Sequence, residues 1–126
     1  MIVLDYKSSK PIYEQITEQI KFHVMKKYLK PGDAIPSVRK LALELKITPG
    51  TVSKAYQELE RQQIIETIRG KGTFIAGEIV LKPDEAKLLS VKKNLQAELV
   101  ELKMMGYDKE MIVDLIKGIY EEMNVC

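Results

Sequence analysis

Segment 36–73 constrains the fold more than any other part of the chain, because two short helical patterns and a β-hairpin pattern follow one another there almost without connecting residues. Ser37 is a good helix N-cap, since its hydroxyl can accept hydrogen bonds from the amides of the first turn. After a short turn, Thr48 is expected to cap a second helix, and Pro49 suits the first helical position. The pattern predicts a helix-turn-helix.

The second helix of this pair is expected to have one apolar face and one small, polar face. The apolar stripe consists of Val52, Ala55, Tyr56 and Leu59. The opposite face carries Gly50, Thr51, Ser53, Lys54 and Gln57. A helix that enters the major groove of DNA needs such a face, because its first turns meet base edges and phosphates at close range.

The hairpin pattern follows this helix directly. Residues 64–68 and 73–75 are rich in β-formers. The tip between them reads Arg69, Gly70, Lys71 and Gly72. Its glycines permit a tight turn and a close approach of the backbone, and its cations are attracted to phosphate. We therefore expect a mainly α fold with a small β-wing, an N-terminal winged helix-turn-helix followed by a two-helix C-terminal dimerisation segment.

Upstream of this motif, isoleucine or valine recurs every four residues within segment 11–28, which predicts an amphipathic helix that supports the other two. The turn at 31–33 ends it, and residues 34–35 are expected to add a short third strand to the wing.

The ordered motifs of residues 10–76 resemble the DNA-binding domain of the GntR family of bacterial transcription regulators. The motifs are PIYEQI at 11–16, KPGD at 30–33, PSVR at 36–39, TV at 51–52 and RGKGTF at 69–74. The short C-terminal remainder resembles the YtrA subfamily. This resemblance implies DNA contacts from the arginine after Pro-Ser-Val, from the start of the second helix and from the glycine-bearing wing.

Carried over position by position, this resemblance supplies a set of candidate DNA-binding residues. They are Ser37, Arg39, Thr48, Gly50, Thr51, Ser53, Lys54, Arg69, Gly70, Lys71, Gly72 and Thr73. Many family members place an arginine and then a polar residue before the threonine, whereas this chain has Pro49 and Gly50. Gly50 has no side chain that could read a base. Sequence readout is therefore expected to depend more on Arg39, Thr51 and Ser53 and on DNA shape.

After residue 78 the pattern changes to two longer amphipathic helices, so we expect domains at 1–78 and 79–126. Two helices cannot enclose a core alone, and we expect their apolar faces to form the interface of a homodimer. The interface candidates are Leu88, Val91, Leu95, Leu99, Leu102, Met111, Leu115, Ile119 and Met123. The alternative is that these faces pack only on their own chain.

Charge and composition exclude several classes of protein. Residues 1–80 carry 13 basic and 9 acidic side chains, a net charge of +4, and the remainder carries a net charge of −2. No apolar run approaches the length of a membrane span, so a cytoplasmic protein is expected. With a single cysteine, Cys126, and a single histidine, His23, neither a metal site nor a cofactor is expected. The wing lacks the spacing of a phosphate-binding loop, and no catalytic constellation stands out, so we expect no enzyme.

The sequence thus predicts a DNA-binding transcriptional regulator that acts as a homodimer on a palindromic, double-stranded operator. Resemblance to the YtrA subfamily implies repression of a nearby operon, often one for a transporter. The main alternative is a winged helix that docks proteins without binding DNA, and an RNA binder is a second. The polar face of the second helix and the lack of stacking aromatics near the wing disfavour both. The sequence identifies no small-molecule effector.

Overall fold

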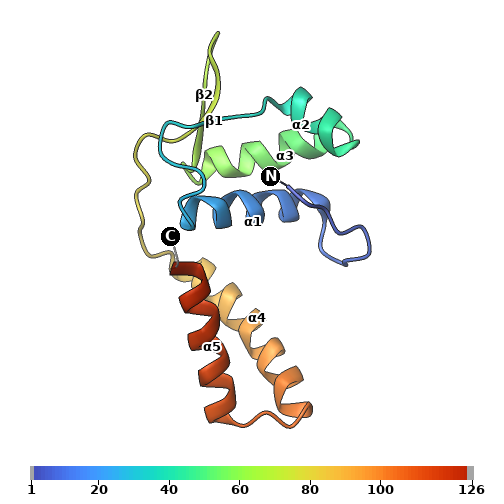
Figure 1. The fold of residues 1–126 in the computed structure, drawn as a ribbon, viewed down its shortest axis with the longest axis vertical. Helices are drawn as coiled ribbons and strands as arrows, with labels where there is room; N and C mark the ends of the chain where they lie inside the picture. Colours follow the sequence, from blue (N-terminus) through green and yellow to red (C-terminus); the bar gives the residue numbers. More distant parts are fainter. Residues whose placement is uncertain (1, 125–126) are drawn as a thin grey trace. The chain divides into compact units, whose positions relative to one another are not determined.

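The computed structural model describes residues 2–124, and the chain separates into two compact units between Val80 and Leu81 (Figure 1). The first unit contains α1 (Ile12–Met25), β1 (Ala34–Ile35), α2 (Val38–Leu45), α3 (Pro49–Arg61), β2 (Ile65–Ile68) and β3 (Gly72–Ile75). The second unit contains α4 (Glu85–Met104) and α5 (Lys109–Asn124). This architecture confirms the predicted winged helix-turn-helix followed by two helices.

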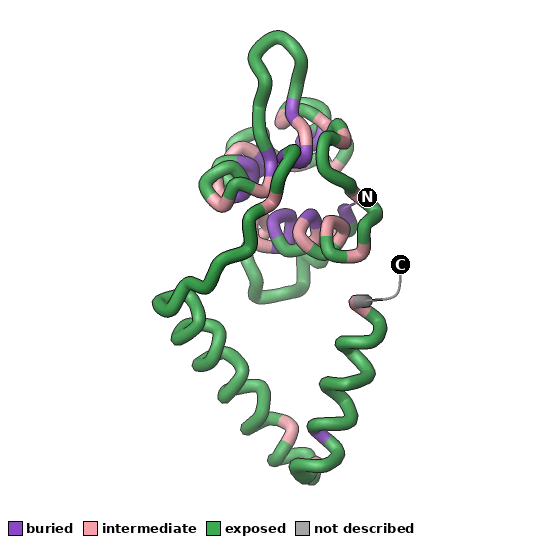
Figure 2. Tube along the Cα trace, turned by 90° about the vertical axis from the view of Figure 1, so that its left-hand side faces the viewer, coloured by how far each residue is buried: buried purple, intermediate pink, exposed green. Residues whose placement is uncertain are grey.

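The core of the first unit lies where α1, α2, α3 and the sheet meet, as the buried segments in Figure 2 show. Six large side chains are completely or almost completely buried there: Ile16, Ile20, Leu41, Val52, Leu59 and Ile75. They come from α1, both helices of the helix-turn-helix and β3, so one apolar cluster holds all four elements together. Burying a side chain of this size contributes about 1.5–3 kcal/mol.

Helix α1 ends three residues before the predicted boundary at residue 28. Lys27 adopts a left-handed conformation with φ of 62°, which breaks the helical path without a glycine. The amides of Tyr28 and Leu29 then both donate to the carbonyl of His23, at 2.9 and 3.2 Å. The apolar spacing alone could not reveal this ending.

The two caps of the helix-turn-helix differ. The Ser37 hydroxyl accepts from the Lys40 amide at 3.1 Å, so the predicted cap of α2 is confirmed. Thr48 is the N-cap of α3, as the sequence predicts, but its side chain makes no capping hydrogen bond with a backbone amide of the helix. Its hydroxyl lies instead 3.0 Å from the hydroxyl of Thr51.

The wing is a three-stranded antiparallel sheet in the order β1-β3-β2, which confirms the expected third strand. Thr67 pairs with Thr73, and Ile68 pairs with Gly72, at the end of the ladder. The turn beyond them is closed by the Lys71 amide, which donates to the Ile68 carbonyl at 2.9 Å. Gly70 turns with φ of 81°, a value that favours glycine.

In the second unit, Asp84 caps α4 by accepting from the Lys87 amide at 3.1 Å. Pro83 therefore precedes the cap. Asp108 accepts from the Met111 amide at 2.9 Å at the start of the last helix.

Helices α4 and α5 leave most of their apolar side chains uncovered (Figure 2). No residue of α4 is buried, and among the described side chains of α5 only Ile112 is buried. No helix of the described chain is long and apolar enough to cross a membrane. The single cysteine, Cys126, lies outside the residues that the structure describes.

Candidate nucleic-acid interface

Arg39 lies in the first turn of α2, where its side chain is exposed. Two hydrogen bonds fix this turn: the Ser37 cap, and a bond from the Tyr56 hydroxyl of α3 to the Pro36 carbonyl at 2.6 Å. Tyr56 is almost entirely buried, and burial is the main cause that raises its pKa above the ordinary value of 10.0. Arg39 is thus carried on a backbone that is tied directly to α3.

The start of α3 borders an open hollow of about 460 Å³. Its lining residues are Pro11, Ile12 and Tyr13 of the α1 start with Thr48, Gly50, Thr51 and Lys54. A Cβ atom added to Gly50 would meet no heavy atom within 4 Å, so the missing side chain leaves this first turn open. An approaching molecule could reach the backbone and hydroxyls of α3 there.

The polar face of α3 continues with Ser53 and Gln57. The Gln57 side-chain amide donates to the Ser53 hydroxyl at 3.2 Å, and both side chains retain further hydrogen-bonding capacity. The apolar stripe predicted for this helix, from Val52 to Leu59, is buried. The polar face is therefore the outward one, as the sequence predicts.

The tip of the wing extends beyond the helices of its own unit (Figure 1). Its four residues, from Arg69 to Gly72, are all exposed. Thr73 differs, because it is buried in the sheet between Ile35 and Thr67, and little of its side chain is available to a ligand. Of the candidate residues in the wing, the four at the tip are the accessible ones.

Four cations distinguish this surface electrostatically. Arg39, Lys54, Arg69 and Lys71 are exposed, and within residues 2–124 none of them forms an ion pair with a carboxylate. Arg61, at the other end of α3, is instead bound to Glu58 at 2.6 Å. The four charges remain available to phosphate groups.

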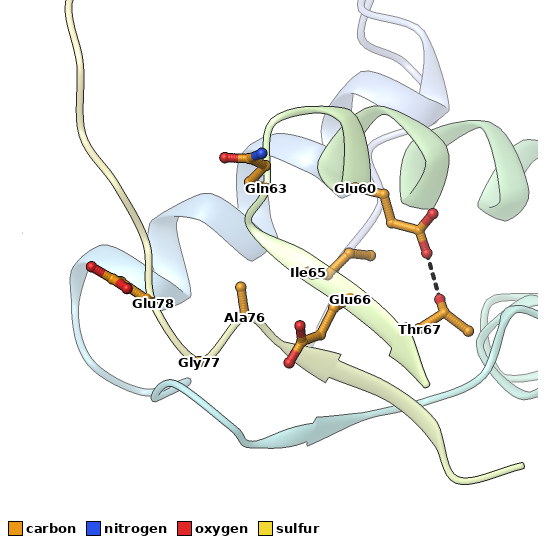
Figure 3. Close-up of a pocket in the computed structure, with 8 residues that line it drawn as sticks. All are labelled: Glu60, Gln63, Ile65, Glu66, Thr67, Ala76, Gly77 and Glu78. Atoms are coloured by element: carbon orange, nitrogen blue, oxygen red, sulfur yellow. Dashed lines mark hydrogen bonds between the residues drawn. The ribbon is translucent and has the colours of Figure 1, made fainter. Parts of the chain in front are cut away.

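A second hollow, of about 770 Å³, lies at the base of the wing and has the opposite character (Figure 3). Its rim carries the carboxylates of Glu60, Glu66 and Glu78, and the Thr67 hydroxyl donates to Glu60. Negative charge of this density repels a phosphate backbone. The acidic base of the wing is therefore less suited to bind a phosphate backbone than the basic tip.

Comparison with known proteins decides the family. The family described as "Bacterial regulatory proteins, gntR family" matches residues 12–75, which include the helix-turn-helix and the wing. The chain belongs to the GntR family. This confirms the resemblance drawn from the sequence motifs.

Among GntR relatives, the chain is 44% identical over 119 residues to the HTH-type transcriptional repressor YtrA of Bacillus subtilis, covering 94% of this chain and 92% of that protein. It also resembles the crystal structure of a transcriptional antiterminator from Listeria monocytogenes EGD-e, with a TM-score of 0.84 and 40% identity, covering 98% of this chain and 92% of that one. The AraR DNA-binding domain in complex with operator ORR3 matches 59% of this chain and 89% of its own, at a TM-score of 0.51 and 27% identity.

These matches identify a GntR transcriptional regulator of the YtrA type, and its relatives are regulators rather than enzymes. Within the described chain, no three metal-ligating side chains come together. Sequence reasoning missed one feature of the GntR surface, the part that α1 plays in it. Tyr13 belongs to the helix that was expected only to support the other two, yet it lines the hollow beside α3, a tertiary contact with no local sequence signal.

Proposed function

We propose that this GntR protein is a homodimeric repressor that binds a palindromic operator through α3, the first turn of α2 and the tip of the wing. The observation that carries the proposal is the set of four exposed cations, Arg39, Lys54, Arg69 and Lys71, which no carboxylate compensates within the described residues. The AraR DNA-binding domain, a structural relative that was solved in complex with operator ORR3, supports the proposal that this chain binds an operator.

In this proposal, the start of α3 enters the major groove and Arg39 reads a base edge beside it. Arginine can donate two parallel hydrogen bonds to O6 and N7 of guanine, the commonest specific contact in that groove. The hydroxyls of Thr51 and Ser53 are short enough to allow close approach. Arg69 and Lys71 of the wing contact phosphates, which fix the register of the protein on the duplex.

The second unit supplies the proposed dimer interface. Leu88, Leu95 and Ile119 are 63%, 55% and 50% exposed, and α4 has no buried residue. Apolar side chains along two whole helices are costly to leave in water, and burying each contributes up to about 1.5–3 kcal/mol. A second copy of the chain is the occupant that we propose, because a two-fold dimer presents the same surface to both half-sites of a palindrome.

This symmetry gives the operator a specific form. The α3 helices of two copies related by a two-fold axis read inverted half-sites. The centres of these half-sites lie about 34–36 Å apart, or a multiple of that distance, on one face of B-DNA. Because YtrA is named as a repressor and the chain resembles its subfamily, we propose that the operator lies near a promoter, with a transporter operon as the expected target.

A protein-docking winged helix is the competing possibility. Docking surfaces are enriched in aromatic and aliphatic side chains at their centre. In the described part of the first unit, none of the large exposed apolar side chains belongs to α3. The outward face of α3 favours DNA over a protein partner.

Binding of purified protein to a 30-base-pair duplex library and to RNA of the same sequences tests this proposal. We expect DNA binding whose affinity falls as salt rises, together with a dimer by light scattering at micromolar concentration. Equal affinity for RNA would contradict DNA recognition. A monomer at that concentration would contradict the proposed dimer interface, but it would leave the proposed DNA binding unaffected.

A further inference from the structure

A lysine of α3 rests on an aromatic ring of α1. The Lys54 ammonium lies 4.0 Å from the centroid of the Tyr13 ring, well inside the range of about 6 Å in which a cation is attracted to an aromatic face. Lys54 is exposed and Tyr13 is half-buried, so the ring forms a fixed platform and the lysine lies on its outer side. Both residues line the hollow at the start of α3.

The carboxylate one helical turn beyond Lys54 is already occupied. Glu58 follows Lys54 by one helical turn and could attract its ammonium. Its carboxylate instead accepts from Arg61 at 2.6 and 3.0 Å and from the Gln62 side chain at 2.8 Å. Lys54 therefore lies against an aromatic ring and, within the described residues, forms no ion pair, whereas Arg61 is paired with Glu58.

This difference matters for binding a polyanion. A free lysine loses rotamer entropy when a ligand fixes it, whereas a lysine already held by a ring loses less. A carboxylate partner would hold the lysine equally well, but it would have to be displaced or would repel the phosphate. An aromatic ring orients the cation without neutralising it.

From this geometry we propose that Tyr13 is a positioning residue of the DNA-binding surface: its ring holds Lys54 at the edge of the hollow, ready to contact a backbone phosphate of the operator. The inference rests on the proposed DNA binding and extends it to α1, which lies outside the helix-turn-helix. The open first turn at Gly50 leaves room for the DNA strand to reach the Lys54 ammonium.

A double-mutant cycle on Tyr13 and Lys54 tests the inference, with affinity measured for a duplex that the wild-type protein binds. Tyr13→Phe keeps the ring and should bind within about twofold of wild type. Tyr13→Leu removes the ring and should weaken binding about two- to fivefold, the change expected for an exposed cation–π contact. Lys54→Ala should weaken binding and lower the salt slope, the change of log affinity with log salt concentration, by about one.

The coupling between the two positions decides the question. In the Lys54→Ala background, Tyr13→Leu should have no further effect, because the ring then has no cation to hold. An equal loss of affinity in both backgrounds would overturn the inference, since Tyr13 would then act independently of Lys54. Tyr13→Met replaces Tyr13→Leu in the cycle if the latter lowers the unfolding temperature.

A matched control comes from the other end of α1. The Tyr28 ring lies 5.9 Å from the Lys26 ammonium, so Tyr28→Leu removes a similar contact that lines no part of the α3 hollow. This variant should bind DNA as the wild type does. If Arg39→Ala and Lys71→Ala weaken binding but Lys54→Ala does not, the inference is wrong and the proposed function stands. If the wild-type protein binds no DNA, the proposed function itself fails.

Discussion

The Tyr56 hydroxyl of α3 donates to the Pro36 carbonyl at 2.6 Å, and this bond connects the helix proposed to read DNA to the backbone that carries Arg39. Tyr56 is only 4% exposed, so its hydroxyl is largely shielded from water and depends on this bond. The two halves of the helix-turn-helix are therefore held at a fixed spacing by a polar contact as well as by the apolar cluster.

Tyr56→Phe should lower the free energy of unfolding by about 1 kcal/mol, because the Pro36 carbonyl loses its donor while the ring still fills the core. Chemical denaturation measures this change directly. Tyr28→Phe, at an exposed tyrosine of the same unit, should leave stability within about 0.5 kcal/mol of wild type. An unchanged midpoint for Tyr56→Phe would show that the bond contributes nothing to folding.

Tyr56 should also make the protein sensitive to alkali. Burial raises the pKa of its hydroxyl above the ordinary value of 10.0, so above that pH the unfolded chain loses this proton while the folded chain keeps it. The folded state then binds more protons, and stability falls as pH rises, by up to about 1.4 kcal/mol per pH unit for this group. Urea unfolding from pH 8 to 11 should show a shallower decline in Tyr56→Phe. If the free energy of unfolding declined in parallel in the two proteins, the alkali sensitivity would not come from the Tyr56 hydroxyl.

Arg39→Ala should weaken binding to the operator by roughly 1–3 kcal/mol and relax specificity at a single base pair, if its guanidinium reads a guanine. Competition binding against operators substituted at each position measures both effects. Lys40→Ala removes the neighbouring exposed charge and should lower the affinity for all DNA sequences slightly and equally. If Arg39→Ala lowered the affinity for all operators equally, Arg39 would contact a phosphate rather than a base.

Lys71→Ala, at the tip of the wing, should lower the affinity for operator DNA and for random DNA about equally, and should lower the salt slope by about one. The reason is that a phosphate contact releases a counterion but carries no sequence information. Lys103→Ala makes the same change of charge on α4 and should leave the salt slope unaltered. A loss confined to the operator would show that the wing reads bases.

Leu95→Glu should dissociate the proposed dimer, because it places a charge on the apolar stripe of α4. Light scattering at micromolar concentration should report a monomer, and circular dichroism should show that the helices persist. Lys92→Glu introduces the same side chain at an exposed polar position of α4 and should remain dimeric. A dimer in both variants would place the interface elsewhere.

The parts of the fold that depend on local sequence could be predicted. The Ser37 cap and the glycine turn of the wing each depend on residues a few positions apart, and the structure shows both. The ending of α1 could not be predicted, because Lys27 adopts a left-handed conformation that gives no sequence signal.

Tertiary relationships also escaped sequence reasoning. The platform that Tyr13 offers to Lys54 joins helices far apart in the chain. For the candidate DNA-binding residues, the structure shows which ones are exposed, and their contacts with DNA remain a prediction.

Selection of bound fragments from random genomic DNA, at near-physiological salt and followed by sequencing, tests the central claim most directly. The account predicts enrichment of an inverted repeat whose half-site centres lie about one helical turn, or a multiple of it, apart, because a two-fold dimer presents two recognition helices in opposite orientations. If no fragment were enriched and binding vanished at moderate salt, the surface of α3 and the wing would be a general polyanion patch, and the claim of a sequence-specific regulator would be contradicted.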